Sequence, residues 1–370
     1  MQMGLAGLGL LAAGPALGAT PPDYVLHNHK PIDLETLPHR LKPFVTPTQA
    51  FYIRSHHPHE PVVELDSWRL KIDGLVNQAA ELRWADVEGM TPCSLTAVLQ
   101  CSGNGRAFFR PRVPGSAWKE GALGNAQWTG IPLRDVVQKL GVDPRARFLV
   151  MNGSDQPLPK TATPKFQQVL PLDKALDPDT LLAFQMNGKP LSHLHGFPLR
   201  VIAPGWQGQK WVKWLSHLEF TEHDPNTYWY AKAYRVPATP QPPGRELPPE
   251  QMVPIEEIPV KSLLLGPVHG ARLPLGRPVM LEGKAWTGGK KRVARVEVDT
   301  GSGWETADLG EVQPYTWVEF RHSWTPRARG KVELRCRATD DSGATQPEKP
   351  GWNPSGYNWN GIDHKGVTVV

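Results

Sequence analysis

The chain has 370 residues with a formal net charge of +5, and 39% of its residues are hydrophobic. This length suggests two or three domains, and the 41 basic and 36 acidic residues are mixed without a Lys/Arg run of the kind that binds nucleic acid. We therefore expect no nucleic-acid partner, and the positive excess favours small anions or an acidic protein partner.

The N-terminal stretch 2–19 is apolar, rich in small residues, and ends in a cleavage pattern near Ala19. This composition is typical of the end of an export signal, although the usual positive segment is missing, and the stretch is short for a membrane span. We assign 1–19 to an export-signal remnant and expect a periplasmic or otherwise exported protein. No other stretch is apolar enough to cross a bilayer, so we expect no stable membrane span.

The region 20–255 begins with an irregular segment rich in Pro and His and continues with short strands and helices. Alternating or continuous apolar runs predict strands, and amphipathic runs predict helices. The expected strands are Trp68–Leu75, Leu95–Leu99, Arg147–Asn152, Leu181–Met186, Phe197–Ala203 and Trp211–Phe220, and the expected helices are Ile131–Leu140 and Leu172–Leu176. The order lacks the strict βαβ repetition of a dinucleotide fold, so we predict an α+β domain.

The segment 237–259 is rich in Pro, Glu and Gln and is expected to form a linker or a surface strap. Four alternating segments follow, separated by Gly-rich turns: Pro278–Ala285, Arg292–Asp299, Thr316–His322 and Lys331–Ala338. Short strands at this spacing predict an immunoglobulin-like β-sandwich over 256–370. The aromatic segment Trp352–Asn360 near the end is expected to be a loop.

Cys101 stands between an apolar run and the turn-forming sequence Gly103–Asn104–Gly105. Arg106 follows at once, and a cation beside a cysteine lowers the pKa of its thiol and favours the thiolate, which acts as nucleophile or metal ligand. The same stretch also fits an inert core cysteine, and we expect Cys93 and Cys336 to be core or surface thiols. The sequence has no CxxC, CxxCH or HExxH motif, so zinc-finger, c-type haem and zincin sites lack support.

Several motifs follow one another along the chain: FYIRSHHP (Phe51–Pro58), LQCSGNGR (Leu99–Arg106), GALGNAQWTGIPLRDVV (Gly121–Val137), LLAFQMNGKPL (Leu181–Leu191), HGFPLRVIAPGWQGQKWVKWL (His195–Leu215) and VKSLLLGP. In this order they resemble the sulfite oxidase family of molybdenum-cofactor enzymes. The resemblance covers nearly everything after residue 44. It implies a molybdopterin-binding catalytic domain over 20–255 and a β-sandwich often used for dimerisation, so that the chain would form a homodimer.

The resemblance also implies roles for individual residues. Cys101 would be the molybdenum ligand, since a soft thiolate suits this centre. Arg54 and Arg106 would bind the substrate oxyanion through their guanidinium forks. Trp118 would form an aromatic wall of the substrate pocket, and Tyr234 would be the active-site tyrosine.

Two neighbouring tyrosines, Tyr228 and Tyr230, compete with Tyr234 for this last assignment. The cofactor-binding positions that the resemblance implies are Tyr52, His56, Asp155, His195, Arg200, Gly208, Lys210 and Lys213. The segment WNPSGY shows no arginine where vertebrate members carry a third anion-binding one.

The implied reaction is the oxidation of sulfite to sulfate, with electrons passed to an external acceptor such as a c-type cytochrome. The implied cofactors are molybdenum and molybdopterin, in the Mo-molybdopterin rather than a dinucleotide form, without haem. A related molybdopterin enzyme acting on sulfane sulfur, nitrate or a sulfoxide is the nearest alternative, although the sandwich argues against the single-domain sulfoxide reductases. A cysteine hydrolase using Cys101 with a histidine, and a non-catalytic cofactor carrier, stay open, and molybdenum content and turnover with sulfite separate them.

Overall fold

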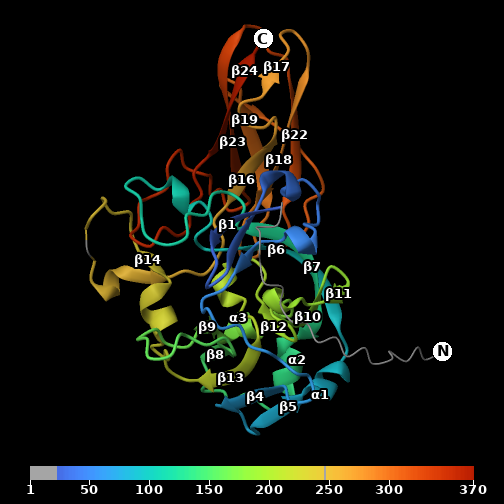
Figure 1. The fold of residues 1–370 in the computed structure, drawn as a ribbon, viewed down its shortest axis with the longest axis vertical. Helices are drawn as coiled ribbons and strands as arrows, with labels where there is room; N and C mark the ends of the chain where they lie inside the picture. Colours follow the sequence, from blue (N-terminus) through green and yellow to red (C-terminus); the bar gives the residue numbers. More distant parts are fainter. Residues whose placement is uncertain (1–22, 246) are drawn as a thin grey trace, which may run out of the picture.

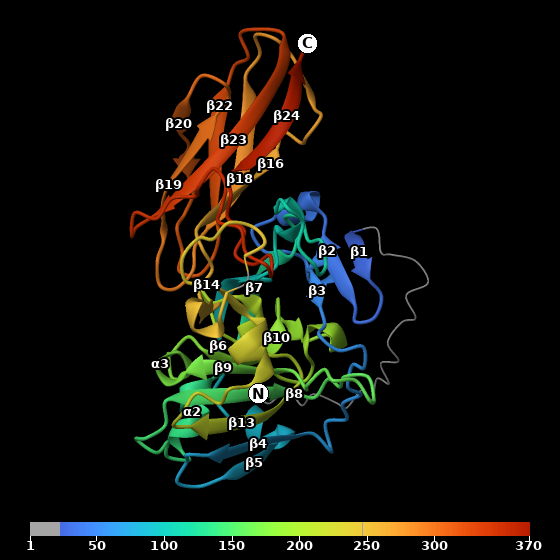
Figure 2. The same cartoon turned by 90° about the vertical axis from the view of Figure 1, so that its left-hand side faces the viewer.

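The computed structural model describes residues 23–245 and 247–370, so the export-signal assignment lies outside the described residues. The chain is elongated, with a larger mixed domain at one end and a β-sandwich at the other (Figure 1). Figure 2 shows the same division from the side, with β1–β3 lying beside the junction of the two blocks. The α+β domain followed by a sandwich that the sequence predicts is confirmed.

The chain enters through a small three-stranded sheet of β1 (Tyr24–Asn28), β2 (Asp33–Thr36) and β3 (Ile53–Arg54). The strands β2 and β3 are antiparallel, and their register places Asp33 opposite Arg54. Tyr24, Leu34 and Ile53 form a small apolar cluster that holds this sheet together. This small sheet, which precedes the main domain in the sequence, therefore holds the backbone of Arg54 in a fixed position.

Two five-stranded sheets build the larger domain. One has the order β11-β10-β7-β6 with β12 paired to β10, and the other has the order β5-β4-β13-β8-β9. Their bounds are β4 Arg69–Gly74, β5 Ala80–Arg83, β6 Cys93–Gln100, β7 Leu123–Pro132, β8 Phe148–Gly153, β9 Gln167–Pro171, β10 Leu181–Met186, β11 Lys189–Pro190, β12 Arg200–Ile202 and β13 Leu215–Thr221. The short helices are α1 Trp84–Glu88, α2 Leu133–Gln138 and α3 Leu172–Ala175.

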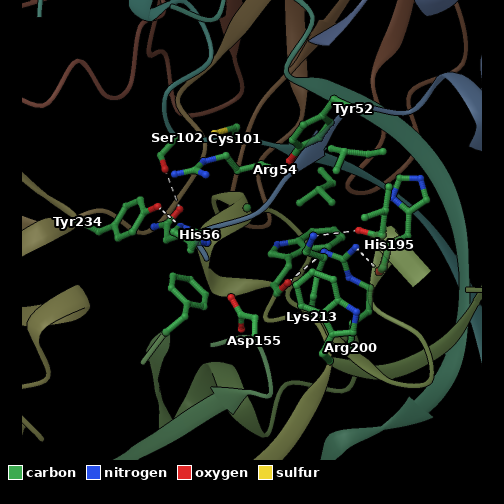
Figure 3. Close-up of a pocket in the computed structure, with 18 residues that line it drawn as sticks. Tyr52, Arg54, His56, Cys101, Ser102, Asp155, His195, Arg200, Lys213 and Tyr234 are labelled. Atoms are coloured by element: carbon green, nitrogen blue, oxygen red, sulfur yellow. Dashed lines mark hydrogen bonds between the residues drawn. The ribbon is translucent and has the colours of Figure 1, made fainter. Parts of the chain in front are cut away.

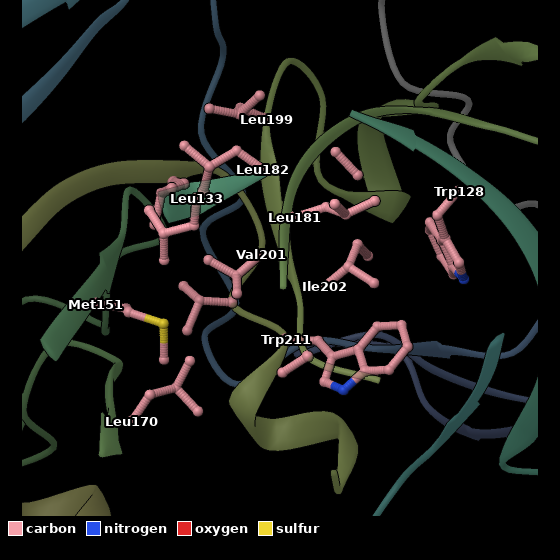
Figure 4. Close-up of a cluster of buried hydrophobic side chains, with 14 of the residues drawn as sticks. Trp128, Leu133, Met151, Leu170, Leu181, Leu182, Leu199, Val201, Ile202 and Trp211 are labelled. Atoms are coloured by element: carbon pink, nitrogen blue, oxygen red, sulfur yellow. The ribbon is translucent and has the colours of Figure 1, made fainter. Parts of the chain in front are cut away.

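A single large apolar core fills the space between these sheets (Figure 4). Leu181 and Leu182 of β10 pair with Ile202 and Val201 of β12, and all four side chains are buried. Burying each aliphatic side chain of this size contributes about 1.5–3 kcal/mol relative to exposure. The strand ends that carry the polar residues described below are therefore anchored in a rigid core.

Most predicted elements are found. The N-terminal segment, which the sequence predicts to be irregular, instead holds β1–β3, the short elements β5, α1, β9 and β11 are additional, and the expected strand Phe197–Ala203 is only β12. Three further differences have a local cause. The strand β7 is absent from the sequence prediction because nearly all of its residues are buried, so it shows no polar–apolar alternation. Because β7 runs through Pro132, the expected helix Ile131–Leu140 begins only at Leu133. The expected strand Trp211–Phe220 begins only at Leu215, since Trp214 adopts a φ of 51° that interrupts extended backbone.

The sandwich consists of the sheets β16-β18-β22-β21 and β17-β24-β23-β19-β20. Their bounds are β16 Lys261–Gly266, β17 Arg272–Leu273, β18 Val279–Trp286, β19 Val293–Asp299, β20 Trp304–Thr306, β21 Asp308–Leu309, β22 Val318–Trp324, β23 Gly330–Asp340 and β24 Asp363–Val369. The four strands predicted from alternation correspond to β18, β19, β22 and β23. The last strand, β24, was not predicted, and it completes the sheet beside β23.

The Pro-rich segment 237–259 is a surface strap with some structure of its own. It carries the two-stranded sheet of β14 (Arg235–Pro237) and β15 (Met252–Pro254). Its end is tied to the larger domain, because the backbone N–H of Gln207 donates to the carbonyl of Glu256 at 2.8 Å. Within the described residues, no helix is long and apolar enough to cross a membrane.

Candidate active site

An elongated cavity opens at the junction of β3, β6 and the loops that flank β12 and β13. It encloses about 650 Å³ counted out to its open mouth. Figure 3 shows Cys101, Arg54 and Tyr234 toward one end and His195, Arg200 and Lys213 toward the other. The predicted site residues that line it are Tyr52, Arg54, His56, Cys101, Asp155, His195, Arg200, Gly208, Lys213 and Tyr234.

Cys101 directly follows β6 and starts a tight turn. Its backbone N–H donates to the carbonyl of Ala122 at 2.9 Å, and its own carbonyl accepts from the N–H of Asn104 at 2.9 Å. Burial raises the pKa of the Cys101 thiol, while the positive charges of Arg106 and Arg54 oppose this rise. The sequence expectation of a lowered pKa is therefore wrong in its net direction for the protein without a bound metal. Coordination to a metal would deprotonate the thiol outright.

Arg54 reaches the cavity from β3 and is held by the small N-terminal sheet. Its Nη1 donates to Oδ1 of Asp33 at 3.1 Å and also to the carbonyl of Ser55. Burial has the largest single effect and lowers the pKa of Arg54, but Asp33, Tyr234, Cys101 and Tyr357 together outweigh it. The net direction is upward, so the guanidinium stays charged. Asp33 is itself almost fully buried and accepts a second hydrogen bond from Ser116 Oγ. Arg54 is thus a fixed cation with its remaining N–H groups available to an anion.

Tyr234 follows a π-helical turn at Trp229–Ala233 and points toward His56 (Figure 3). The Tyr234 hydroxyl and His56 Nε2 form a hydrogen bond. Burial strongly lowers the pKa of His56 and strongly raises the pKa of Tyr234, so the hydroxyl donates to a neutral imidazole. Tyr228 is 47% exposed and Tyr230 packs beneath Lys210, so of the three competing tyrosines only Tyr234 lines the cavity.

The opposite end of the cavity is basic. Arg200 is buried, its two terminal nitrogens donate to the carbonyls of His195 and Trp211 at 2.9 and 3.0 Å, and its guanidinium lies 5.1 Å from the Trp128 ring centroid. Among the described residues, no acceptor lies within hydrogen-bond distance of its Nε. Lys213 donates to Ser55 Oγ and the Leu194 carbonyl, and burial together with Arg200 lowers its pKa to about 7. A bound anion would stabilise the buried positive charges of Arg200 and Lys213.

Asp155, Gly208 and Tyr52 line the middle of the cavity. Burial raises the pKa of Asp155 to about 6 against the opposing charge of Lys213. A Cβ at Gly208 would lie 2.8 Å from the Gln100 carbonyl oxygen and 3.0 Å from the Tyr52 hydroxyl, so only glycine allows this close approach. Glycine at this position therefore lets the turn pack directly against Gln100 of β6 and against Tyr52.

Three predicted site residues lie outside the cavity lining. Lys210 is buried, donates to the Val169 carbonyl at 2.7 Å and faces the Tyr230 ring at 4.6 Å. Trp118 is fully buried against His27, with ring centroids 4.8 Å apart. Arg106 lies behind Cys101, where its Nε donates to the Ser355 carbonyl at 3.1 Å. For Lys210 the structure shows a packing and hydrogen-bonding role, whereas Arg106 still acts electrostatically on Cys101.

Residues that the sequence did not assign also contribute. Asp33 orients Arg54, and Ser102 lines the cavity with its Oγ bonded to Gln209 Oε1 at 3.1 Å. Tyr357, from the aromatic segment of the sandwich, stacks on Tyr234 with ring centroids 5.2 Å apart. The only sequence indication for Tyr357 was the aromatic composition of its loop, because its contacts are more than 100 residues away.

The cavity fits a molybdopterin group with a terminal phosphate. Cys101 at one end could ligate molybdenum, and Lys213 with the unpartnered Arg200 Nε at the other end could hold a phosphate. The described residues contain no cluster of three or more His, Cys, Asp or Glu side chains able to hold a metal. A metal in this cavity would therefore take its further ligands from a bound group.

Replacing Lys213 with methionine is expected to lower cofactor content while raising the stability of the cofactor-free protein. The pKa of Lys213 falls from its ordinary value to about 7 on folding, so at pH 7 and below the folded state carries a buried charge that destabilises it. Removing this charge should raise the free energy of unfolding at pH 6 by about 1–3 kcal/mol, a net value from which the loss of the two Lys213 hydrogen bonds has been subtracted. The gain in stability should become smaller toward pH 10.

The measurements are pterin and molybdenum per chain, and denaturant unfolding of cofactor-free protein at several pH values. Lys174→Met is the matched control, since Lys174 is also buried and bonds only the Pro204 carbonyl, outside the cavity. Equal cofactor content in the Lys213→Met protein and the wild type would remove Lys213 from the binding site.

The chain matches two protein families along its length. Residues 56–229 match the oxidoreductase molybdopterin binding domain, and residues 252–365 match the Mo-co oxidoreductase dimerisation domain. The chain is 33% identical over 366 residues to sulfite oxidase of Gallus gallus, covering 93% of this chain and 78% of that protein. It is 32% identical over 348 residues to mitochondrial sulfite oxidase of Drosophila melanogaster, covering 88% of this chain and 60% of that protein. The chain spans 60–65% of the length of this and several other mitochondrial sulfite oxidases.

A solved structure is similar over almost the whole chain. The sulfane dehydrogenase SoxCD from Paracoccus pantotrophus superposes with a TM-score of 0.76 at 25% identity, covering 98% of this chain and 92% of that chain. The similarity therefore includes both the domain that carries the cavity and the sandwich.

Proposed function

The chain belongs to the sulfite oxidase family of molybdopterin oxidoreductases, and from this premise we propose that it oxidises sulfite to sulfate at a molybdenum centre held by Cys101. The observation that supports the proposal is that the two ends of one cavity carry different chemical groups. A thiol faced by the Arg54 guanidinium lies at one end, and the basic pair Arg200 and Lys213 lies at the other. This arrangement suits a cofactor whose metal and phosphate lie at opposite ends, with a small oxyanion bound beside the metal.

The reaction balances as sulfite plus water giving sulfate, two protons and two electrons. The bound molybdenum cofactor would supply oxygen-atom transfer and accept the two electrons. Arg54 would bind and orient the oxyanion through charge-assisted hydrogen bonds, with its position fixed by Asp33. The Tyr234 hydroxyl, bonded to neutral His56, would hold a proton at Tyr234 Oη, since burial keeps the phenol protonated and the imidazole neutral.

We further propose the Mo-molybdopterin form of the cofactor, an exported location, and a homodimer formed through the sandwich. The dimer rests on the match of residues 252–365 to a dimerisation domain. Electrons would pass to an external acceptor such as a c-type cytochrome. The sequence contains no CxxCH motif and only three cysteines, whereas an iron–sulfur cluster normally takes four ligands. The positive net charge would favour an acidic face on that acceptor.

Oxidation of sulfane sulfur is a second candidate function. It is supported by the overlap of this fold with a sulfane dehydrogenase over nearly the whole of both chains. It is also compatible with Ser355, which stands in the segment where the resemblance leads us to expect a third arginine.

The test is metal analysis combined with substrate-dependent reduction of an acceptor. We expect stoichiometric molybdenum and rapid reduction of ferricyanide or cytochrome c upon addition of sulfite, without a haem absorption band. Thiosulfate serves as a competing electron donor, and nitrate is tested separately as an electron acceptor. Molybdenum with turnover of thiosulfate but not sulfite would favour the second candidate, and turnover with rapid oxygen consumption and no cytochrome reduction would refute the cytochrome acceptor. Protein without molybdenum after expression with an adequate cofactor supply would contradict both.

A further inference from the structure

A loop of the sandwich, residues 353–360, lies against the turn that carries Cys101. The backbone N–H of Asn358 donates to the Ser102 carbonyl at 3.0 Å, and the Asn358 side chain accepts from Gln207 Nε2 at 2.8 Å. Trp359 packs so closely on Gly105 that a Cβ there would lie 2.4 Å from its ring. The sandwich is therefore part of the wall behind the cysteine.

Tyr357 lies at the centre of this loop and contacts two residues of the cavity region. The Arg106 guanidinium lies 5.0 Å from the centroid of its ring, within cation–π range. On the other side, the ring of Tyr357 stacks on Tyr234 with an interplanar angle of 19°. The Arg106 side chain is further fixed by its hydrogen bond to the carbonyl of Ser355 in the same loop.

Among the described residues, the partners of the Arg106 side chain are neutral, and two of them, Ser355 and Tyr357, belong to this loop. Its hydrogen bonds go to the carbonyls of Ser355 and Ser116, and its π partner is Tyr357. Burial raises the pKa of Tyr357, with the Arg106 charge opposing, so the ring is a neutral phenol. The charge of Arg54, in contrast, is partly neutralised by its ion pair with Asp33. The charge of Arg106 is therefore not neutralised by a carboxylate among the described residues, and from behind the cavity wall it acts electrostatically on the Cys101 end.

We propose that Tyr357 is a positioning residue that holds the Arg106 guanidinium beside Cys101 and thereby sets the affinity of the site for its oxyanion. The inference rests on the proposed function only for the identity of the oxyanion. It makes the sandwich a contributor to substrate binding in addition to its match to a dimerisation domain. The feature that we expect to act is the negative face of the aromatic ring, 5.0 Å from the guanidinium.

The experiment compares Tyr357 replaced by phenylalanine and by pentafluorophenylalanine in the molybdenum-loaded, full-length protein. The two rings have nearly the same shape, but fluorination removes the negative face that attracts a cation. Measured quantities are kcat and KM for sulfite, the dissociation constant of sulfate by calorimetry, and the thermal midpoint. The matched control is the same pair of replacements at Tyr315, another sandwich tyrosine at the domain junction, which bonds Asp179 at 2.8 Å and lies 6.0 Å from Lys174 Nζ.

We expect the phenylalanine protein to stay within twofold of wild type. The pentafluorophenylalanine protein should show a KM for sulfite and a sulfate dissociation constant raised about fivefold to thirtyfold, with kcat within twofold and the thermal midpoint unchanged. The Tyr315 pair should differ from one another by less than twofold.

Equal constants for the two Tyr357 proteins would overturn the inference. So would a fall in kcat that accompanies earlier unfolding, since that pattern belongs to a merely structural contact. If the wild type does not oxidise sulfite, the proposed function fails. The sulfate titration still tests the role of Tyr357 in that case.

Discussion

Replacing Cys101 with serine is expected to reduce sulfite turnover below about 1% of the wild-type rate, a loss of more than roughly 2.7 kcal/mol of transition-state stabilisation. Serine keeps the size of the side chain and the turn that Asn104 closes, so the fold should persist. A hydroxyl is a hard and poorly acidic donor, whereas a thiolate suits a soft metal centre. The expected defect is therefore confined to the chemistry at the metal.

The measurement is sulfite-dependent ferricyanide reduction, normalised to molybdenum per chain. Cys93→Ser is the matched control, because Cys93 is an exposed thiol at the start of the same strand, β6. We expect this control to keep the wild-type rate. A Cys101→Ser protein that retains more than a few per cent of that rate at full metal loading would show that Cys101 is not the ligand.

Much of the cavity could be predicted because its residues lie in short contiguous motifs. The segment from Tyr52 to His56 places four lining residues within five positions, and the segment from His195 to Lys213 supplies the basic end. Strand alternation likewise predicted the sandwich strands β18, β19, β22 and β23, each with one face in the core. In both cases the information was local in sequence.

The rest could not be predicted because it depends on contacts between distant segments. A lysine in a motif looks the same whether it faces a cavity or a backbone carbonyl, and only the fold shows that Lys210 bonds Val169. The pKa of Cys101 is raised mainly by burial, and the residues next to Cys101 in the sequence do not show that its side chain is buried. Tyr357, near the end of the chain, stacks on Tyr234 of the cofactor domain. Neither segment contains a sequence pattern that predicts this contact.

Replacing Arg54 with glutamine is expected to lower kcat/KM for sulfite by about one to two orders of magnitude, chiefly by raising KM. Losing one charge-assisted hydrogen bond to an anion costs about 1.5–3 kcal/mol. Reoxidation of the metal by the acceptor should change little, because Arg54 is assigned to substrate binding. Arg112→Gln is the control, since Arg112 is an exposed arginine outside the cavity lining. An unchanged kcat/KM at low ionic strength would place Arg54 outside the substrate site.

The buried carboxylate of Asp33 complicates a single replacement at position 54, and a double variant separates the two effects. Arg54→Gln alone leaves Asp33 with Ser116 as its remaining side-chain partner, so part of the loss would come from an uncompensated buried charge. Arg54→Gln/Asp33→Asn removes both charges. We expect this double variant to regain thermal stability without regaining affinity for sulfite, because the cation that binds the anion is still missing. Recovery of KM in the double variant would instead show that Arg54 serves mainly to neutralise Asp33.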